Sequence, residues 1–305
     1  MSDFIGTKLT MNLGERSYDI IVKRGSLENL YQFARLDRRV AVVTDSGVPA
    51  QYAQMVADQC KDATIITVPQ GEASKSFKIL ETVLRQMLDF GMGRGDLVVA
   101  VGGGVVGDLA GFAASIYMRG IDFINCPTTT LSMIDSSIGG KTAVDLGDTK
   151  NIVGAFWQPK LVIVDPDTLS TLPRRHFING LAEAIKAGLL ADPELFSIFE
   201  KEDVDDRIGD IICRSLRFKK SIVEQDETEQ GMRKALNFGH TIGHGIEAVK
   251  GIKGRRTTGL FHGECVALGM LPMIESKALQ KRVRGVYPVS YTHPPLRVAH
   301  PHRLR

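Results

Sequence analysis

The stretch that decides the fold is LVVAVGGGVVGD, residues 97–108. Its first five residues are apolar without alternation, which is typical of a strand buried on both faces of a parallel sheet. The glycines that follow match G-x-G-x-x-G in the context that gives this pattern meaning, after a strand and before a helix. Such glycines let the backbone approach a pyrophosphate, and the helix N-terminus supplies N–H donors. The stretch predicts a dinucleotide-binding turn; a tight turn that merely needs small residues is the alternative.

Short β-rich runs alternate with helical runs on both sides of this stretch. This order predicts a doubly wound α/β domain. The expected strands are Lys8–Leu13, Tyr18–Val22, Arg39–Thr44, Thr64–Val68, Leu97–Val101, Asp122–Cys126 and Leu161–Val164, and the expected helices are Leu27–Ala34, Ala50–Gln59, Phe77–Phe90 and Val106–Ser115.

The character of the sequence changes after Pro173, where few β-branched runs remain. Helical periodicity predicts helices at Pro193–Glu200, Arg207–Gln225 and Glu264–Gln280. We therefore expect an α/β dinucleotide-binding domain at residues 1–172 and an all-α domain at 173–284, with a ligand site in the cleft between them.

Composition excludes several classes of protein. The net charge of +3 on 305 residues is too small to indicate a nucleic-acid partner. No run of about eighteen apolar residues suggests a membrane span, and the start has no signal-peptide pattern. The four cysteines are scattered, which predicts reduced thiols in a cytoplasmic protein.

Polar residues follow several of the expected strands. Asp45 ends one strand and is suited to a ribose hydroxyl, although classical dinucleotide folds carry this acid downstream of the glycines. The turn at residues 69–75 holds Glu72 and Lys75. A run of three threonines, 128–130, precedes a loop with Asp135, Lys141, Lys150 and Asn151. These groups suit a nucleotide or a phosphoryl group; a solvated loop is the alternative, and for Lys150 alone it is the favoured one.

Histidines and a carboxylate in the second half indicate a metal site. Glu183 and Lys186 share one helical face among apolar neighbours, where charges need partners or a metal. If residues 233–244 form one helix, Arg233, Asn237, His240 and His244 lie on a single stripe. His262 opens a later helix. Two histidines with one carboxylate are a common catalytic zinc set; a hydrogen-bonded core role is the alternative for each histidine.

Taken together, these motifs resemble the 3-dehydroquinate synthases. The resemblance rests on GEASKS, GGGVVGDLAGF, YMRG, PTTTL, DSSIGGKTAVD, KN, GLAEAIKAG, the run from Asp226 to Glu247, and HGE. It implies catalytic NAD and a divalent metal, zinc or cobalt. The implied metal ligands are Glu183, His240 and His262, and the implied NAD contacts are Asp45, Glu72, Lys75, Gly103, Gly104, Val105, Asp108, Thr128, Thr129 and Leu131.

The resemblance also implies a phosphorylated sugar-acid substrate, 3-deoxy-D-arabino-heptulosonate 7-phosphate, converted to 3-dehydroquinate and phosphate. Arg119 in YMRG resembles a residue that reaches the neighbouring subunit's site, which implies a homodimer. The implied catalytic residues are Asp135, Lys141, Lys186, Lys219 and His244, and the implied substrate-binding residues are Arg119, Lys150, Asn151, Arg233 and Asn237.

Other interpretations stay open from the sequence. One is another sugar-phosphate cyclase making an inosose or a valiolone, and a second is a polyol dehydrogenase related to glycerol dehydrogenase. The last residues, 285–305, are rich in Pro, His and Arg and depart from the family pattern. They predict a disordered tail and a shortened helical domain that lacks a substrate-binding lysine, so an inactive NAD-binding fragment is a third interpretation.

Overall fold

The computed structural model describes residues 6–248 and 259–287. Its main sheet has seven strands in the order β1-β2-β9-β6-β5-β3-β4. The β1–β2 pair is antiparallel, and the other pairs are parallel. The strands are β1 (Thr7–Met11), β2 (Tyr18–Val22), β3 (Arg39–Asp45), β4 (Asp62–Val68), β5 (Leu97–Gly102), β6 (Asp122–Pro127) and β9 (Leu161–Val164).

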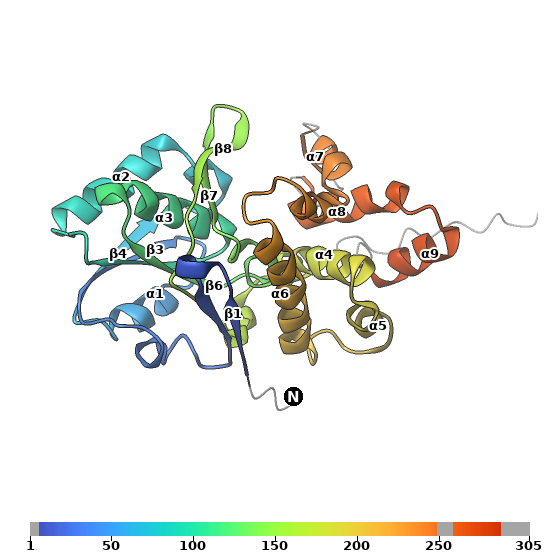
Figure 1. The fold of residues 1–305 in the computed structure, drawn as a ribbon, viewed down its shortest axis with the longest axis horizontal. Coiled ribbons are helices and arrows are strands. Elements are labelled where there is room, and N and C mark those ends of the chain that lie inside the picture. Colours follow the sequence, from blue (N-terminus) through green and yellow to red (C-terminus); the bar gives the residue numbers. More distant parts are fainter. Residues whose placement is uncertain (1–5, 249–258, 288–305) are drawn as a thin grey trace, which may run out of the picture.

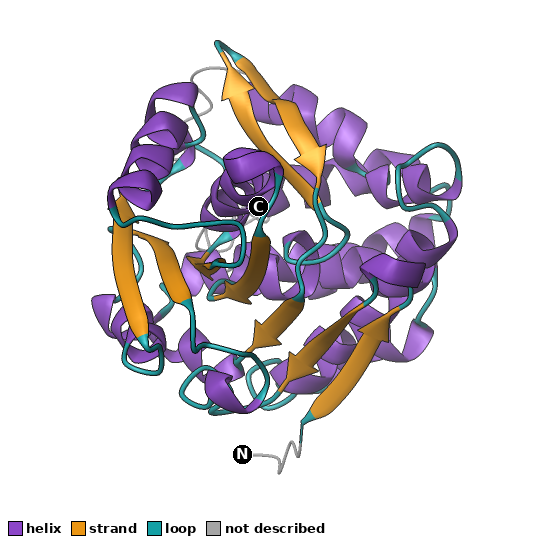
Figure 2. Ribbon diagram, turned by 60° about the vertical axis from the view of Figure 1, so that its left-hand side comes forward, coloured by secondary structure: helices purple, strands orange, loops and turns teal. Residues whose placement is uncertain are grey.

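Helices cover both faces of this sheet, as the apolar strands predict (Figure 2). Every residue of β5 is buried. Val98 and Ala100 pack with α2 (Phe77–Asp89) and α3 (Gly104–Ile116) in one core cluster. Val99 and Val101 pack with α1 (Ala50–Ala57) in another. Alternate side chains of one strand therefore feed two cores, and the doubly wound arrangement is confirmed.

A β-hairpin that the sequence did not predict stands apart from the main sheet (Figures 1 and 2). It is formed by β7 (Lys141–Leu146) and β8 (Thr149–Phe156), which pair antiparallel around Gly147, whose φ is +59°. Most side chains of β8 are exposed. In β8 only Val153 and Ala155 are partly buried, so the strand leaves little apolar pattern, and residues expected to form a loop are ordered as strands.

The expected helix at Leu27–Ala34 was wrong in extent. Only a single 3₁₀ turn forms there, η2 (Leu30–Gln32). The amide of Gln59 donates to the carbonyl of Leu27 at 2.9 Å, and its oxygen accepts from the N–H of Tyr31 at 3.1 Å. These side-chain bonds hold backbone groups that a longer helix would need.

Beyond Pro173 the described residues form helices and turns, with no strand among them. The expected helix at Glu264–Gln280 is broken, because the chain forms η8 (Leu271–Met273) around Pro272, a residue that cannot continue a helix. The disordered tail expected from residue 285 was wrong for its first residues, because the last helix runs to Val286 and Tyr287 is buried; residues 288–305 lie outside the described part. The helices are α4 (Arg174–Leu190), α5 (Pro193–Lys201), α6 (Ile208–Gln225), α7 (His240–Ala248), α8 (His262–Met270) and α9 (Lys277–Val286).

Helix α4 joins the helical part to the sheet by a close approach of backbones. A Cβ atom on Gly180 would lie 2.2 Å from the backbone nitrogen of Leu131 and 2.6 Å from the carbonyl carbon of Thr130. Both atoms belong to the turn that follows β6. Because backbone cannot rotate out of the way as a side chain can, this position accepts only glycine.

We expect Gly180→Ala to lower the free energy of unfolding by about 1–3 kcal/mol, because the added methyl group overpacks a backbone contact. Urea unfolding measures the loss. Gly285→Ala is the matched control, since a Cβ at this helical position in α9 has no neighbour within 4 Å. The control should be neutral or stabilise by up to about 1 kcal/mol. Equal stability of the two variants would contradict the backbone-contact argument.

Candidate functional site

The main sheet has a topological switch point between β3 and β5. The chain passes from β3 to β4 on one side and then returns to β5 on the other side of β3. Ligands of open α/β sheets bind outside the carboxyl ends of the strands at such a point. Asp45 is the last residue of β3, and Gly103 follows β5 directly. The residues predicted to contact a nucleotide lie in the segments that follow β3, β4, β5 and β6.

The glycine-rich turn has the geometry that a pyrophosphate requires. Gly103 is the extended residue before α3, and no side chain caps the helix. The uncapped first-turn N–H groups are available as donors to an anion. A Cβ on Gly103 would lie 3.1 Å from Thr129 Cγ2, and one on Gly104 would lie 3.0 Å from Ser136 Oγ. The turn therefore fits a nucleotide phosphate, and small residues also serve its packing.

A buried lysine ties this turn to the hairpin. Lys75, 4% exposed, places its Nζ 2.6 Å from Asp108 Oδ2 in α3 and also contacts the side-chain oxygen of Asn151 in β8. Burial raises the pKa of Asp108, and the Lys75 ammonium opposes the rise. Asn151 has a left-handed φ of +55°, and its N–H donates to Asp145 at 2.8 Å. Three predicted residues thus form one contact network.

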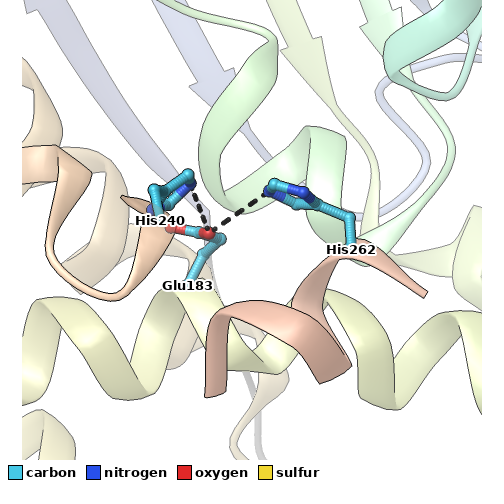
Figure 3. A group of neighbouring side chains, drawn as sticks. All are labelled: Glu183, His240 and His262. Carbon is cyan, nitrogen blue, oxygen red and sulfur yellow. Dashed lines mark ion pairs between the residues drawn. The ribbon is translucent and has the colours of Figure 1, made fainter. Parts of the chain in front are cut away.

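Glu183, His240 and His262 converge from α4, α7 and α8 (Figure 3). Glu183 is 3% exposed. Its Oε1 lies 3.5 Å from His240 Nε2 and 3.9 Å from His262 Nε2. Burial lowers the pKa of His240, although Glu183 opposes this, so the ring favours its neutral, metal-binding form.

These residues fit a divalent metal. The Glu183 oxygens are buried without a hydrogen-bond partner, although the Lys186 ammonium contacts Oε2 as an ion pair. A buried carboxylate oxygen that accepts no hydrogen bond is costly. A cation bound between Oε1 and the two imidazole nitrogens would compensate for this cost. Tetrahedral ligands about 2.0–2.1 Å from zinc are about 3.4 Å apart, close to the separations observed here.

Two buried lysines stand beside this group. Lys186 also donates to the carbonyl of Leu236 at 2.7 Å. Lys219 in α6 lies 2.8 Å from the Asp135 carboxylate. Burial by itself raises the pKa of Asp135, but the ammonium groups of Lys219 and Lys186 lower it overall. Burial lowers the pKa of Lys219, and Asp135 opposes this. Asp135, Glu183, Lys186 and Lys219 line one small cavity.

A second cluster of cations gathers around Glu229, a residue that the sequence analysis did not single out. Its carboxylate contacts Lys141 and accepts from Asn237 Nδ2 at 3.1 Å. Arg233, 1% exposed, donates to the carbonyl of Gly139 at 3.1 Å and to that of Glu227. Burial by itself raises the pKa of Glu229, but Lys141 lowers it overall. The cluster suits an anionic ligand.

Comparisons with known proteins agree with this geometry. The family model described as 3-dehydroquinate synthase N-terminal matches residues 65–179, and the one described as 3-dehydroquinate synthase C-terminal matches residues 180–285. The chain belongs to the 3-dehydroquinate synthase family. The family predicted from the sequence motifs is thus confirmed.

Curated relatives named 3-dehydroquinate synthase share over two fifths of their aligned residues with the chain. The protein of Pelobacter propionicus is 44% identical over 276 residues, which cover 86% of this chain and 76% of that one. The protein of Streptococcus mutans is 44% identical over 276 residues, which cover 87% of this chain and 76% of the relative.

Solved structures of two related cyclases are also similar. One is 2-deoxy-scyllo-inosose synthase complexed with carbaglucose-6-phosphate, NAD⁺ and Co²⁺, with a TM-score of 0.79, 27% identity, and coverage of 87% of this chain and 75% of that one. The other is a 2-epi-5-epi-valiolone synthase from Streptomyces hygroscopicus with NAD⁺ and Zn²⁺ bound, with a TM-score of 0.78, 29% identity, and coverage of 90% and 81%. The α/β-plus-helical fold class is confirmed.

The single helical stripe expected from Arg233 to His244 was wrong in this family member. The segment consists of η7 (Met232–Asn237) and α7, separated at Gly239, whose φ is +80°. A Cβ on Gly239 would lie 2.5 Å from Met270 Cγ, so α8 packs tightly against the break. The two parts of the segment consequently serve different clusters, with Asn237 beside Glu229 and His244 beside His240 at 5.4 Å between ring centroids.

Two of the predicted residues lie at the edges of the synthase site. Lys150 in β8 forms an ion pair with Glu247 in α7 at 2.7 Å rather than pointing freely into solvent. Arg119 is exposed in η4 (Tyr117–Arg119), beyond the C-terminal end of α3. The helical rise of about 1.5 Å per residue puts that end roughly 20 Å from the glycine-rich turn. Arg119 is therefore not brought together with the other predicted residues of its own chain.

The described helices include none that is both long and apolar enough to cross a membrane.

Removing the Lys219 ammonium should expose how strongly it stabilises Asp135. We expect Lys219→Met to lower the free energy of unfolding at pH 7 by about 1–3 kcal/mol, because the carboxylate loses a charged partner. The pKa of Asp135 should rise, since the loss of a nearby cation disfavours the ionised form. Urea unfolding of Lys219→Met, Asp135→Asn and the double variant measures the pair. The double variant should lose less than the sum of both single losses, and additive losses would argue against the pairing.

Proposed function

We propose that this chain is a 3-dehydroquinate synthase that converts 3-deoxy-D-arabino-heptulosonate 7-phosphate to 3-dehydroquinate and phosphate, using NAD and a divalent metal. The observation that carries the proposal is the convergence of Glu183, His240 and His262 beside a buried set of cations. The three metal ligands alone would suit many reactions. Together with the neighbouring lysines they suit a substrate that has both a hydroxyl group for the metal and a negative charge for the cations.

The segments after β3 to β6 would hold NAD, which supplies a hydride acceptor when bound. Asp45 would accept a ribose hydroxyl at the end of β3, and the first turn of α3 would donate N–H groups to the pyrophosphate. Lys75 would keep Asp108 and the hairpin in place beside the nucleotide. The full proposed set is Asp45, Glu72, Lys75, Gly103, Gly104, Val105, Asp108, Thr128, Thr129 and Leu131.

Glu183, His240 and His262 would hold zinc or cobalt. When bound, such an ion polarises a substrate hydroxyl and so favours its oxidation. Lys186 forms an ion pair with the buried Glu183 carboxylate. The Phe238 carbonyl lies 3.3 Å from His240 Nδ1, which turns Nε2 of this ring toward Glu183.

The cations would position the substrate's charged groups. Lys141 and Asn237 contact Glu229, so an entering phosphate would compete with this carboxylate for their N–H groups, and the nearby Arg233 adds a positive charge. Asp135 and Lys219 would hold hydroxyl and carboxylate groups of the sugar acid from the opposite cluster. Lys150, Asn151 and His244 lie at the hairpin side of the site and complete the proposed substrate contacts.

A homodimer explains the position of Arg119. Its side chain is exposed far from its own chain's glycine-rich turn, so it would contribute to the site of a second copy.

The absence of paired cysteines among the described residues is consistent with a reducing, cytoplasmic location.

The direct test is phosphate release from 3-deoxy-D-arabino-heptulosonate 7-phosphate with NAD and zinc, recorded together with absorbance of NADH. We expect phosphate release without net NADH, because the hydride returns to the sugar within each turnover. Steady NADH accumulation would instead favour a polyol dehydrogenase. Phosphate release only from a different sugar phosphate would favour another cyclase, and bound NAD without turnover would favour an inactive fragment.

The metal role has its own prediction. His240→Ala should lose more than about 100-fold in kcat, because one of three protein ligands is gone. NAD binding, followed by calorimetry, should persist, since His240 lies in α7 and the proposed nucleotide contacts follow the strands of the main sheet. Unchanged phosphate release by this variant would exclude His240 as a metal ligand.

A further inference from the structure

Glu247 in α7 contacts one proposed metal ligand and one residue of the hairpin. Its Oε2 lies 3.3 Å from His262 Nδ1, and its Oε1 lies 2.7 Å from Lys150 Nζ. The side chain is 22% exposed, so it is largely sheltered from solvent. Neither the sequence motifs nor the proposed ligand set gave this residue a role.

The His262 ring faces a carboxylate on each of its nitrogens. Nε2 lies 3.9 Å from Glu183 Oε1, on the side where a metal would sit, and Nδ1 faces Glu247 on the other side. A hydrogen bond at one nitrogen of an imidazole fixes both the tautomer and the direction of the other nitrogen. A carboxylate behind a histidine also makes that histidine a stronger metal ligand.

We propose that Glu247 is a positioning residue that aims His262 Nε2 at the metal and couples this ligand to the β7–β8 hairpin through Lys150. The inference rests on the proposed metal set. Of the three ligands, His240 is oriented by the Phe238 carbonyl and Glu183 by Lys186. His262 is oriented by a side chain that also contacts the opposite half of the molecule.

The two oxygens of Glu247 face different partners. Oε2 faces the His262 ring and Oε1 faces the Lys150 ammonium, so one carboxylate can contact both at once, one per oxygen.

Through Lys150 the contact continues toward the nucleotide turn. Asn151 is the next residue of β8, and its side chain contacts Lys75, which in turn holds Asp108 in α3. Lys150 thus contacts Glu247, which orients a metal ligand, and Asn151 contacts Lys75, which holds the glycine-rich turn. The position of the hairpin would therefore affect both sites.

The same atoms allow a competing interpretation. His244, Glu247 and His262 also lie close enough together to hold a cation. We favour positioning because the Lys150 ammonium already lies 2.7 Å from Glu247 and would repel a second cation. The two interpretations differ in the number of metal ions bound per chain.

The test is metal affinity, measured by zinc competition with a chromogenic chelator, and the visible spectrum of the Co²⁺-loaded protein. Glu247→Gln keeps the shape of the side chain but removes its charge, and it should weaken zinc binding by about 10–100-fold and alter the Co²⁺ bands. Lys150→Met should weaken zinc binding by about 2–5-fold, as expected for losing one half-exposed ion pair. Glu200→Gln is the matched control, since Glu200 pairs with Arg282 on α9 at 2.7 Å, away from the metal set, and it should change neither readout.

Several outcomes would overturn the proposal, and they are separable from failure of the proposed function. Wild-type protein that binds no zinc would remove the proposed metal site itself. If the wild type binds zinc and Glu247→Gln has the same zinc affinity and the same Co²⁺ bands, then Glu247 does not position His262. Two ions per wild-type chain and one in Glu247→Gln would make Glu247 a ligand. If Glu247→Gln fails to fold, the zinc affinity of Lys150→Met is the test. A zinc affinity equal to that of the wild type would exclude coupling between His262 and the hairpin.

Discussion

The burial of one carboxylate, Glu183, is the constraint on which much of the structure depends. It lies in α4, a helix whose residues from Phe177 to Gly188 are all buried, so water cannot solvate its charge. A charge in such surroundings needs compensation from within the protein. Lys186, one turn along the same helix, supplies part of it, and two imidazoles from α7 and α8 face the remaining oxygen. Because Gly180 seats the same helix on the backbone after β6, the carboxylate is placed next to the sheet's ligand-binding edge.

The hairpin is the second element that joins the two halves of the molecule. Figure 1 shows it rising from the α/β part on the side that faces α7 and α8. Its polar residues contact Lys75 in the sheet domain, and Lys150 and Lys141 contact carboxylates of the helical part. The two ion pairs to the helical part join half-exposed lysines to carboxylates, and each is worth little by itself. The hairpin's own apolar residues, Val144 above all, pack in the core of the α/β part, so its connection to the helical part depends on these polar contacts.

The sequence predicted the parts of the fold that rest on local patterns. Strands buried on both faces leave continuous apolar runs, so the strands of the main sheet were found within a few residues. The metal group was found because a carboxylate and clustered histidines among apolar residues are costly to bury unless they bind a cation. The hairpin was missed because its exposed strand carries no periodic signal. The stripe from Arg233 to His244 failed at Gly239, where packing against Met270 imposes a left-handed residue that no local pattern indicates. Glu229 and Glu247 were missed for a related reason, since their importance comes from partners distant in the sequence.

The pairing of charges explains why this site suits an anionic substrate better than a neutral polyol. Each of four lysines in or beside the site already contacts a carboxylate: Lys141 contacts Glu229, Lys150 contacts Glu247, Lys186 contacts Glu183, and Lys219 contacts Asp135. A ligand that displaces one of these carboxylates must interact with the lysine more strongly than the carboxylate does. A phosphate, with its larger charge and three acceptor oxygens, can do so by engaging Lys141, Arg233 and Asn237 together. A neutral polyol cannot compete for these donors, and it would leave Lys141 and Asn237 paired with Glu229. Discrimination then arises from the cost of separating existing ion pairs, which only a strongly charged ligand offsets.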